Sequence, residues 1–92
     1  MLDITLSAHF GSTAANWAEN LMEEIGDKEE AAIREFVDKA VMPDMVTEVC
    51  RACEDRGIRN PDTMESYAKH AVSQFDKRLN QLLAQRQPHT TH

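Results

Sequence analysis

The sequence predicts an all-α protein, a compact bundle of four helices with a long C-terminal helix. Apolar residues recur every three or four positions through most of the chain, and capping residues and prolines stand where helices begin and end. Only one short segment shows the alternation of apolar and polar residues that is typical of a β-strand. The chain has 92 residues, enough for one domain, expected over residues 12–86. A domain this small buries about two-thirds of its unfolded surface, so self-association is expected.

The first helix is expected over residues 13–25. Ser12 or Thr13 provides an oxygen that accepts a hydrogen bond from a first-turn amide, and Gly26 follows the last apolar residue. The apolar residues at helical spacing are Ala14, Trp17, Ala18, Leu21, Met22 and Ile25. This stripe predicts that one face of the helix is buried.

The next two helices are expected over residues 28–41 and 43–56. Asp27 and Glu30 have the spacing of a capping box, and Gly57 supplies a left-handed helix end. Met42 precedes Pro43, and a residue before proline avoids the helical region, so the chain is expected to bend sharply there without a loop. The expected apolar stripes are Ile33, Phe36, Val37, Ala40 and Val41 in the first of these helices, then Val46, Val49, Cys50 and Cys53 in the second.

The fourth helix is expected over residues 61–86, with Asn60 as its cap and Pro61 in its first turn. Its apolar residues are Met64, Tyr67, Ala68, Ala71, Val72, Phe75, Leu79, Leu82 and Leu83. Their spacing is near 3.5 residues, as in a coiled coil, and the helix would be about 38 Å long. Because the other expected helices are much shorter, its end is predicted to meet a second copy or a foreign partner. The predicted self-association seam is Phe75, Leu79, Leu82 and Leu83.

The two ends of the chain are expected to lie outside the bundle. Leu2, Ile4 and Leu6 alternate with polar residues, which predicts an extended N-terminal arm over residues 1–11. The alternative is a strand that pairs with another chain; the arm is favoured because an isolated strand leaves its backbone groups unpaired. Residues 87–92 are polar and include a proline, so a disordered tail is expected.

The net charge of −6 is unevenly distributed. Residues 19–55 contain 12 acidic and 4 basic residues, whereas residues 56–92 contain 3 acidic and 6 basic ones. An acidic half repels nucleic acid and attracts basic protein surfaces, so a protein partner is expected and direct nucleic-acid binding is not. The expected partner-binding surface is Glu19, Glu23, Glu24, Asp27, Glu30, Glu35 and Asp38.

Cys50 and Cys53 raise the question of a metal or redox centre. A zinc site needs four ligands, and the other candidates are four scattered histidines. A redox cysteine usually lies at a helix N-terminus, whereas Cys50 is seven residues past Pro43. Packing as small apolar side chains is therefore the favoured role, and neither a metal nor a cofactor is expected. Because no glycine-rich phosphate loop and no catalytic signature occurs, an enzyme is not expected either.

The chain is expected to be cytoplasmic. It has no apolar stretch of the roughly 18 residues that a membrane span needs, and no basic segment followed by an apolar one at its start. Two cysteines three positions apart do not provide the disulfide framework that stabilises a small secreted protein.

The segment 38–43, Asp-Lys-Ala-Val-Met-Pro, precedes Glu48-Val49, Gly57-Ile58 and Pro61-Asp62-Thr63. This order resembles the middle of the phage Ocr anti-restriction proteins. The resemblance covers roughly residues 28–85 and implies a small, helical, dimeric protein that imitates the phosphate charge of DNA to occupy host restriction enzymes. The fourth expected helix departs from such a mimic, because it carries Lys69, Lys77, Arg78 and Arg86.

A second set of residues is similar to the theta subunit of the bacterial replicative polymerase. The set is Ala31-Ala32, Phe36, Asp38-Lys39, Met42-Pro43, Val49 and Arg51. It spans about 20 residues, after which the match needs an insertion, and the basic composition of that family is missing. The resemblance implies an accessory protein that stabilises a proofreading subunit.

Both resemblances imply a small helical protein whose partner acts on nucleic acid. The expected function is a phage or prophage inhibitor, of the anti-restriction or anti-CRISPR type, that binds and blocks a host defence complex and is itself a homodimer. The alternatives are a theta-like accessory subunit of a replication or proofreading protein, and a structural homo-oligomer without an external partner.

Overall fold

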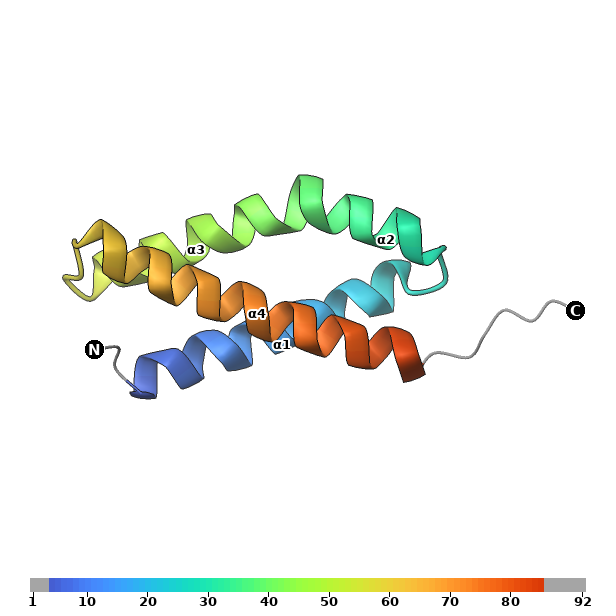
Figure 1. Ribbon diagram of the computed structural model, residues 1–92, viewed down its shortest axis with the longest axis horizontal. Helices are drawn as coiled ribbons and strands as arrows, with labels where there is room; N and C mark the ends of the chain where they lie inside the picture. Colours follow the sequence, from blue (N-terminus) through green and yellow to red (C-terminus); the bar gives the residue numbers. More distant parts are fainter. Residues whose placement is uncertain (1–3, 86–92) are drawn as a thin grey trace, which may run out of the picture.

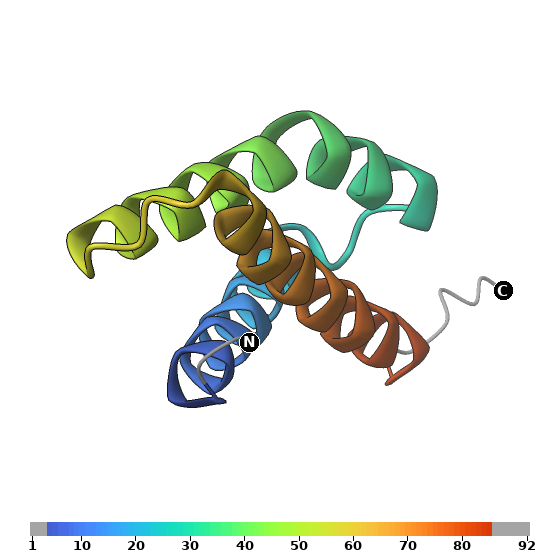
Figure 2. The same cartoon turned by 60° about the vertical axis from the view of Figure 1, so that its left-hand side comes forward.

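The computed structural model describes residues 4–85, and nearly all of this range is helical. The elements are α1 (Ile4–Ile25), α2 (Glu30–Phe36), the π-helical segment η1 (Val37–Val41), α3 (Met42–Asp55) and α4 (Pro61–Gln85) (Figure 1). No strand occurs between residues 4 and 85, which confirms the predicted all-α class. α4 packs against both α1 and α3. In Figure 2, α4 crosses in front, with α1 below it and α2, η1 and α3 above it.

The described chain forms three helical rods, where four separate helices were expected. α2, η1 and α3 follow one another without a break and form one arched rod (Figure 1). Met42 has helical dihedrals (φ −61°, ψ −47°) although it precedes proline, and its amide donates to the carbonyl of Val37. This bond spans five residues, so the turn is wider than an α-turn. The expectation of a sharp break at Pro43 was therefore wrong.

The π turn explains how Pro43 is accommodated inside the arched rod. A proline ring in a regular helix collides with the carbonyl four residues earlier, and the wider turn before Pro43 relieves that collision. The turn also corrects the register of the buried face. From Val37 to Met45 a regular helix would make about 2.2 turns, whereas one π turn lowers this to about 1.9 turns, which is close to two full turns, so both side chains face the core.

The predicted extended arm was wrong for residues 4–11, which are the first part of α1. The buried residues of α1 are Leu6, Phe10, Ala14, Ala18 and Leu21. Their spacing is helical from Leu6 onward. The burial of these side chains against distant helices outweighs the short alternation of apolar and polar residues that suggested an extended chain. Residues 1–3, which belong to the predicted arm, and the predicted tail over 87–92 lie outside the described residues.

Local chemistry ends α3 and begins α4 as predicted. Gly57 has a φ of +79°, a left-handed conformation that glycine adopts without strain. The amide of Ile58 donates to the carbonyl of Cys53 at 2.9 Å and the amide of Gly57 to that of Glu54 at 3.0 Å, which is a Schellman motif. Asn60 then caps α4, because its Oδ1 accepts from the amide of Asp62 at 2.8 Å.

The start of the arched rod differs from the prediction. α2 begins at Glu30 and not at residue 28, and its N-cap Glu29 makes no side-chain hydrogen bond to the first turn. The N-cap residue is thus Glu29, whereas Asp27 was expected at that position.

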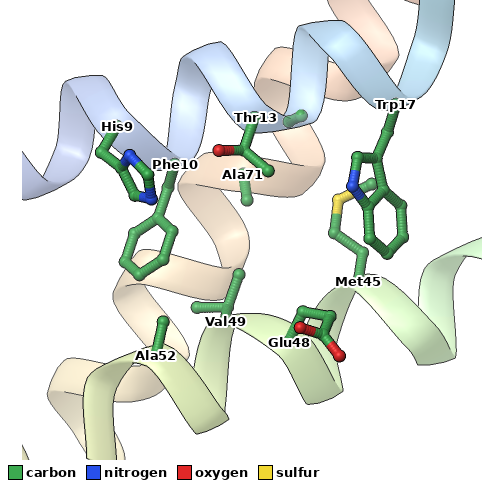
Figure 3. A pocket seen from close by; sticks show the side chains of 10 residues that line it. His9, Phe10, Thr13, Trp17, Met45, Glu48, Val49, Ala52 and Ala71 are labelled. Atoms are coloured by element: carbon green, nitrogen blue, oxygen red, sulfur yellow. The ribbon is translucent and has the colours of Figure 1, made fainter. Parts of the chain in front are cut away.

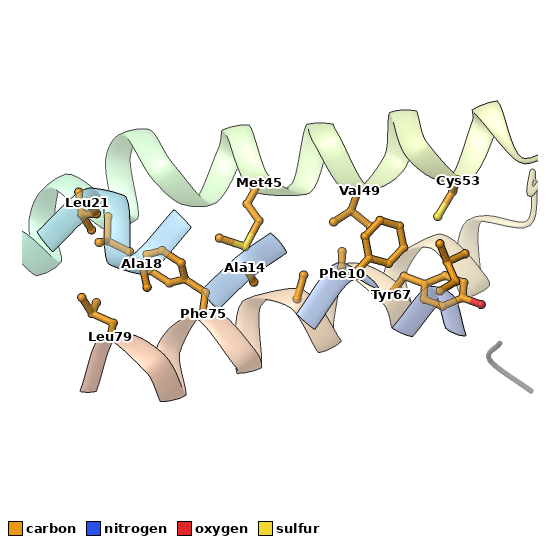
Figure 4. Close-up of a cluster of buried hydrophobic side chains, with 14 of the residues drawn as sticks. Phe10, Ala14, Ala18, Leu21, Met45, Val49, Cys53, Tyr67, Phe75 and Leu79 are labelled. Carbon is orange, nitrogen blue, oxygen red and sulfur yellow. The ribbon is translucent and has the colours of Figure 1, made fainter. Parts of the chain in front are cut away.

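One apolar core joins the three rods (Figure 4). Phe75, Ile33, Leu79 and Cys53 are its largest fully buried side chains. The rings of Phe10 and Tyr67 meet edge to face with centroids 5.4 Å apart. Two residues of the predicted stripes are exceptions, since Phe36 is 46% and Val46 40% exposed. These two exposed apolar side chains mark separate surfaces of the molecule.

Candidate functional site

The acidic residues expected to bind a partner lie along α1, the following turn, α2 and η1. We call this set the acidic end; it consists of Glu19, Glu23, Glu24, Asp27, Glu30, Glu35 and Asp38. The last turns of α1 and the whole of α2 lie at the same end of the molecule (Figure 1, right). The structure thus brings together residues that are also close in sequence.

Three members of the acidic end are already paired with basic side chains. Glu19 accepts from Nε of Arg78 on α4 at 3.0 Å. Glu30 pairs with Arg34 at 2.9 Å, and Glu35 pairs with Lys39 at 2.7 Å. Most of these side chains are more than 40% exposed, so such pairs contribute little to stability. Their main effect here is to cancel charge locally.

The remaining negative charge comes mainly from exposed carboxylates without a cation beside them. Within residues 4–85, Glu23, Glu24 and Asp38 take part in no ion pair. Glu29, which was not among the predicted residues, is also exposed and is the N-cap residue of α2. These side chains give the acidic end a field that attracts basic groups.

An apolar groove opens within the acidic end. It has a volume of about 230 Å³ and lies between α1 and the arched rod. We call it the Phe36 groove; its lining residues are Trp17, Asn20, Leu21, Glu24, Phe36 and Val41. Phe36 is exposed because the buried stripe of its helix runs through Ile33 and Val37, and one residue of rotation is about 100°. Phe36 was expected on the buried stripe of its helix, so this surface was not predicted from the sequence.

A larger apolar groove lies between α3 and α4. Its volume is about 500 Å³. We call it the α3–α4 groove; it is lined by Val46, Cys50, Pro61, Met64, Glu65, Ala68, Lys69 and Val72. No residue of α1 lines it, so it is a different face from the Phe36 groove.

The predicted self-association seam is largely inside the protomer. Phe75 is 0%, Leu79 1% and Leu83 9% exposed, and Leu82 is partly buried against the same core. Three of the four predicted residues therefore have no surface to offer a second copy. The prediction assumed that the other helices were too short to cover this end of α4. In the structure α1 has 22 residues, and it covers α4.

The two cysteines of α3 differ in their surroundings. Cys53 is fully buried, as predicted, whereas Cys50 is half-buried in the α3–α4 groove. Burial raises the pKa of the Cys53 thiol above its ordinary value, and the nearby Cys50 raises it further. A thiol in this state is a poor nucleophile. Among residues 4–85, no group of three or more His, Cys, Asp or Glu side chains is arranged to hold a metal ion.

A third cavity lies between α1 and α3 (Figure 3). It holds about 120 Å³, and its walls are mostly apolar. Its ionisable lining residues are His9 on α1 and Glu48 on α3, which point to different parts of the cavity in Figure 3. They are not aligned as an acid and base pair, so we assign this cavity no chemistry.

None of the helices between residues 4 and 85 combines the length and the apolar character that crossing a membrane requires. Comparison of the chain with protein-family models, with curated proteins and with solved structures gives no match. The function is therefore inferred from the surfaces of the molecule.

Proposed function

We propose that this chain is a protein-interaction module whose acidic end binds a basic surface of a partner protein. The observation that carries the proposal is the exposed Phe36, 46% accessible, which lines a groove with Glu24 in the middle of the acidic end. An aromatic side chain in a pocket is a common binding anchor, and unpaired charges around it steer the partner and fix its orientation. The matching partner surface carries an apolar side chain surrounded by Lys or Arg.

We further propose that the partner is a host complex that acts on nucleic acid, such as a restriction or CRISPR complex, and that binding blocks it. Such complexes have basic channels for nucleic acid, which is the surface that the acidic end complements. The resemblances to the Ocr proteins and to polymerase theta point to the same class of partner. A net charge of −6 disfavours direct binding of this chain to DNA or RNA.

The first test reverses charge at the acidic end without disturbing the fold. Glu23 and Glu24 are exposed and lie in the last turn of α1, so the double variant Glu23→Lys/Glu24→Lys places cations where the helix dipole favours them. Glu54→Lys/Asp55→Lys is the matched control, because these two acids are exposed and end α3 in the same way. Glu30 is left unchanged, since it lies in the first turn of α2 and pairs with Arg34.

The wild-type chain and both variants are used as bait for a bacterial lysate, and the retained proteins are identified by mass spectrometry. We expect wild type and the control to retain a nucleic-acid enzyme, and the Glu23→Lys/Glu24→Lys variant to lose it while its circular dichroism is unchanged. Equal retention by both variants would exclude the acidic end as the binding surface.

The proposed inhibition of a host defence complex is tested separately, by the growth of a phage. The chain is expressed in a bacterium that carries a restriction or CRISPR system, and the plating efficiency of a targeted phage is recorded. Inhibition raises the plating efficiency for wild type and the control but not for the Glu23→Lys/Glu24→Lys variant. A retained proofreading exonuclease without any change in plating would favour the theta-like accessory role instead.

A further inference from the structure

The α3–α4 groove differs from the acidic end in both shape and charge. It holds about 500 Å³, and Val46 on its α3 side is 40% exposed. Its apolar lining residues come from α3 and from the N-terminal half of α4, whereas the acidic end lies on α1, the following turn, α2 and η1. A groove between two neighbouring helices has the form that receives another helix.

We propose that the α3–α4 groove is the contact surface for a second copy of this chain, with the two α4 helices antiparallel about a two-fold axis near residues 66 and 67. The apolar residues that α4 gives to the groove are Pro61, Met64, Ala68 and Val72, and two of them lie on each side of this axis. A two-fold axis makes each interface self-complementary, so a contact on one side recurs on the other. Pro61 then meets Val72 of the partner subunit, and Met64 meets Ala68 of the partner subunit, whose small side chain lets the two helices approach closely.

The charged rim of the groove fits the same arrangement. Its charged lining residues are Glu65 and Lys69, which are 3.2 Å apart and have side chains 61% and 77% exposed. Because they lie on either side of residue 67, an antiparallel copy brings each carboxylate toward the ammonium group of the other subunit. Opposite charges therefore meet at both places, and like charges do not.

The balance of charge also favours a second copy over a foreign partner. A strongly basic partner would meet Lys69, and a strongly acidic one would meet Glu65, so either would face one like charge. The acidic end, in contrast, has unpaired carboxylates that favour a basic partner. The two surfaces thus suit two different occupants.

The test is a charge swap followed by sedimentation at several protein concentrations. We expect wild type to form a dimer, and each single variant, Glu65→Lys or Lys69→Glu, to weaken it by about tenfold or more, which corresponds to about 1.4 kcal/mol. The double variant Glu65→Lys/Lys69→Glu restores opposite charges across the axis and is expected to restore the dimer. A wild-type chain that stays monomeric at millimolar concentration, or a double variant no better than the single ones, overturns the proposal.

A second pair of variants separates this surface from the acidic end. Val46→Lys places a charge in the α3–α4 groove and is expected to abolish the dimer, whereas Phe36→Lys charges the other groove and leaves the dimer intact. Both positions are exposed, so neither variant should unfold the chain, and circular dichroism verifies this. If wild type is monomeric and Val46→Lys no longer retains the lysate protein, the α3–α4 groove binds that foreign protein. This result overturns the proposal. Loss of partner retention in Glu23→Lys/Glu24→Lys still tests the acidic end independently.

Discussion

Cys50 and Cys53 lie about one turn apart on α3, yet only one of them belongs to the core. Cys53 is packed among apolar side chains of the core. Cysteine is suited to this environment because its thiol is small and weakly polar. Cys50 lines the open α3–α4 groove. The prediction that both fill the interior is thus confirmed for Cys53 and only partly for Cys50, since a difference of three positions changes the direction of a side chain by about 60°.

The raised pKa of Cys53 predicts a loss of stability in alkaline solution. The thiol of the unfolded chain loses its proton near its ordinary pKa of 9.0, while the buried thiol keeps its proton to higher pH. The contribution of Cys53 is therefore fully present at neutral pH and is lost as the pH rises above about 9. Urea unfolding between pH 7 and 10 should show a steeper decline for Cys50→Ala, which retains Cys53, than for Cys53→Ala.

Thiol labelling checks the same difference between the two cysteines. In the native protein Cys50 should react with a thiol reagent well before Cys53, and both should react together after unfolding. Equal native rates would contradict the placement of Cys53 in the core.

At the scale of single elements, α1 contains a glycine, Gly11, in the interior of the helix. Gly11 lies where α1 meets α4, and a Cβ atom there would be 3.4 Å from Cγ of Gln74 and from Nε2 of His70. These are van der Waals distances, so a methyl group fits but a longer side chain does not. The conformational freedom of Gly11 in the unfolded chain lowers the stability of α1. The packing of α1 on α4 offsets this loss.

Gly11→Ala should therefore raise the free energy of unfolding by about 0.5–1 kcal/mol, because alanine is the better helix former and its methyl group has room. Gly11→Leu should lower it, since the longer side chain pushes α1 and α4 apart. Chemical unfolding followed by circular dichroism measures both changes. A destabilised Gly11→Ala would mean that the two helices are closer here than described.

Elements were predictable from sequence where local chemistry decides them. Gly57, Asn60 and Pro61 determine the end of α3 and the start of α4 through backbone conformation and capping, which act within a few residues. The first turns of α1 were not predictable in this way. There the choice between helix and extended chain depends on the burial of Leu6 and Phe10 against distant helices. The π turn escaped prediction because the rule for residues before proline assumes a regular backbone.

At the scale of the whole molecule, one core connects α1, the arched rod and α4. Phe75 and Phe36 are the same residue type at opposite extremes, 0% and 46% exposed. Phe75→Ala should cost about 3–5 kcal/mol of unfolding free energy, because it leaves a cavity in the core, whereas Phe36→Ala should change it by about 0.5 kcal/mol. Thermal and urea unfolding of the two variants give the comparison. Similar losses for both would contradict the exposure of Phe36.

The candidate site was only partly predictable for reasons that belong to this scale. The acidic end is visible in sequence because its members are neighbours along the chain. The pairing of Glu19 with Arg78 is not visible, since the two residues meet only after α1 and α4 pack. The stripe from Phe75 to Leu83 looked like an interface because the length of α1 was underestimated, and a core stripe and an interface stripe have the same spacing.

The π turn of η1 has a consequence for the gene as well as for the protein. Its main-chain bond encloses one residue more than an α-turn does, so residues 37–41 hold a surplus position that the buried face does not need. A chain shorter by one codon between Val37 and Met45, with an ordinary amino acid in place of Pro43, would close into regular helix and still direct both of these side chains inward. This is the point in the arched rod where one residue can be lost while the interior stays the same.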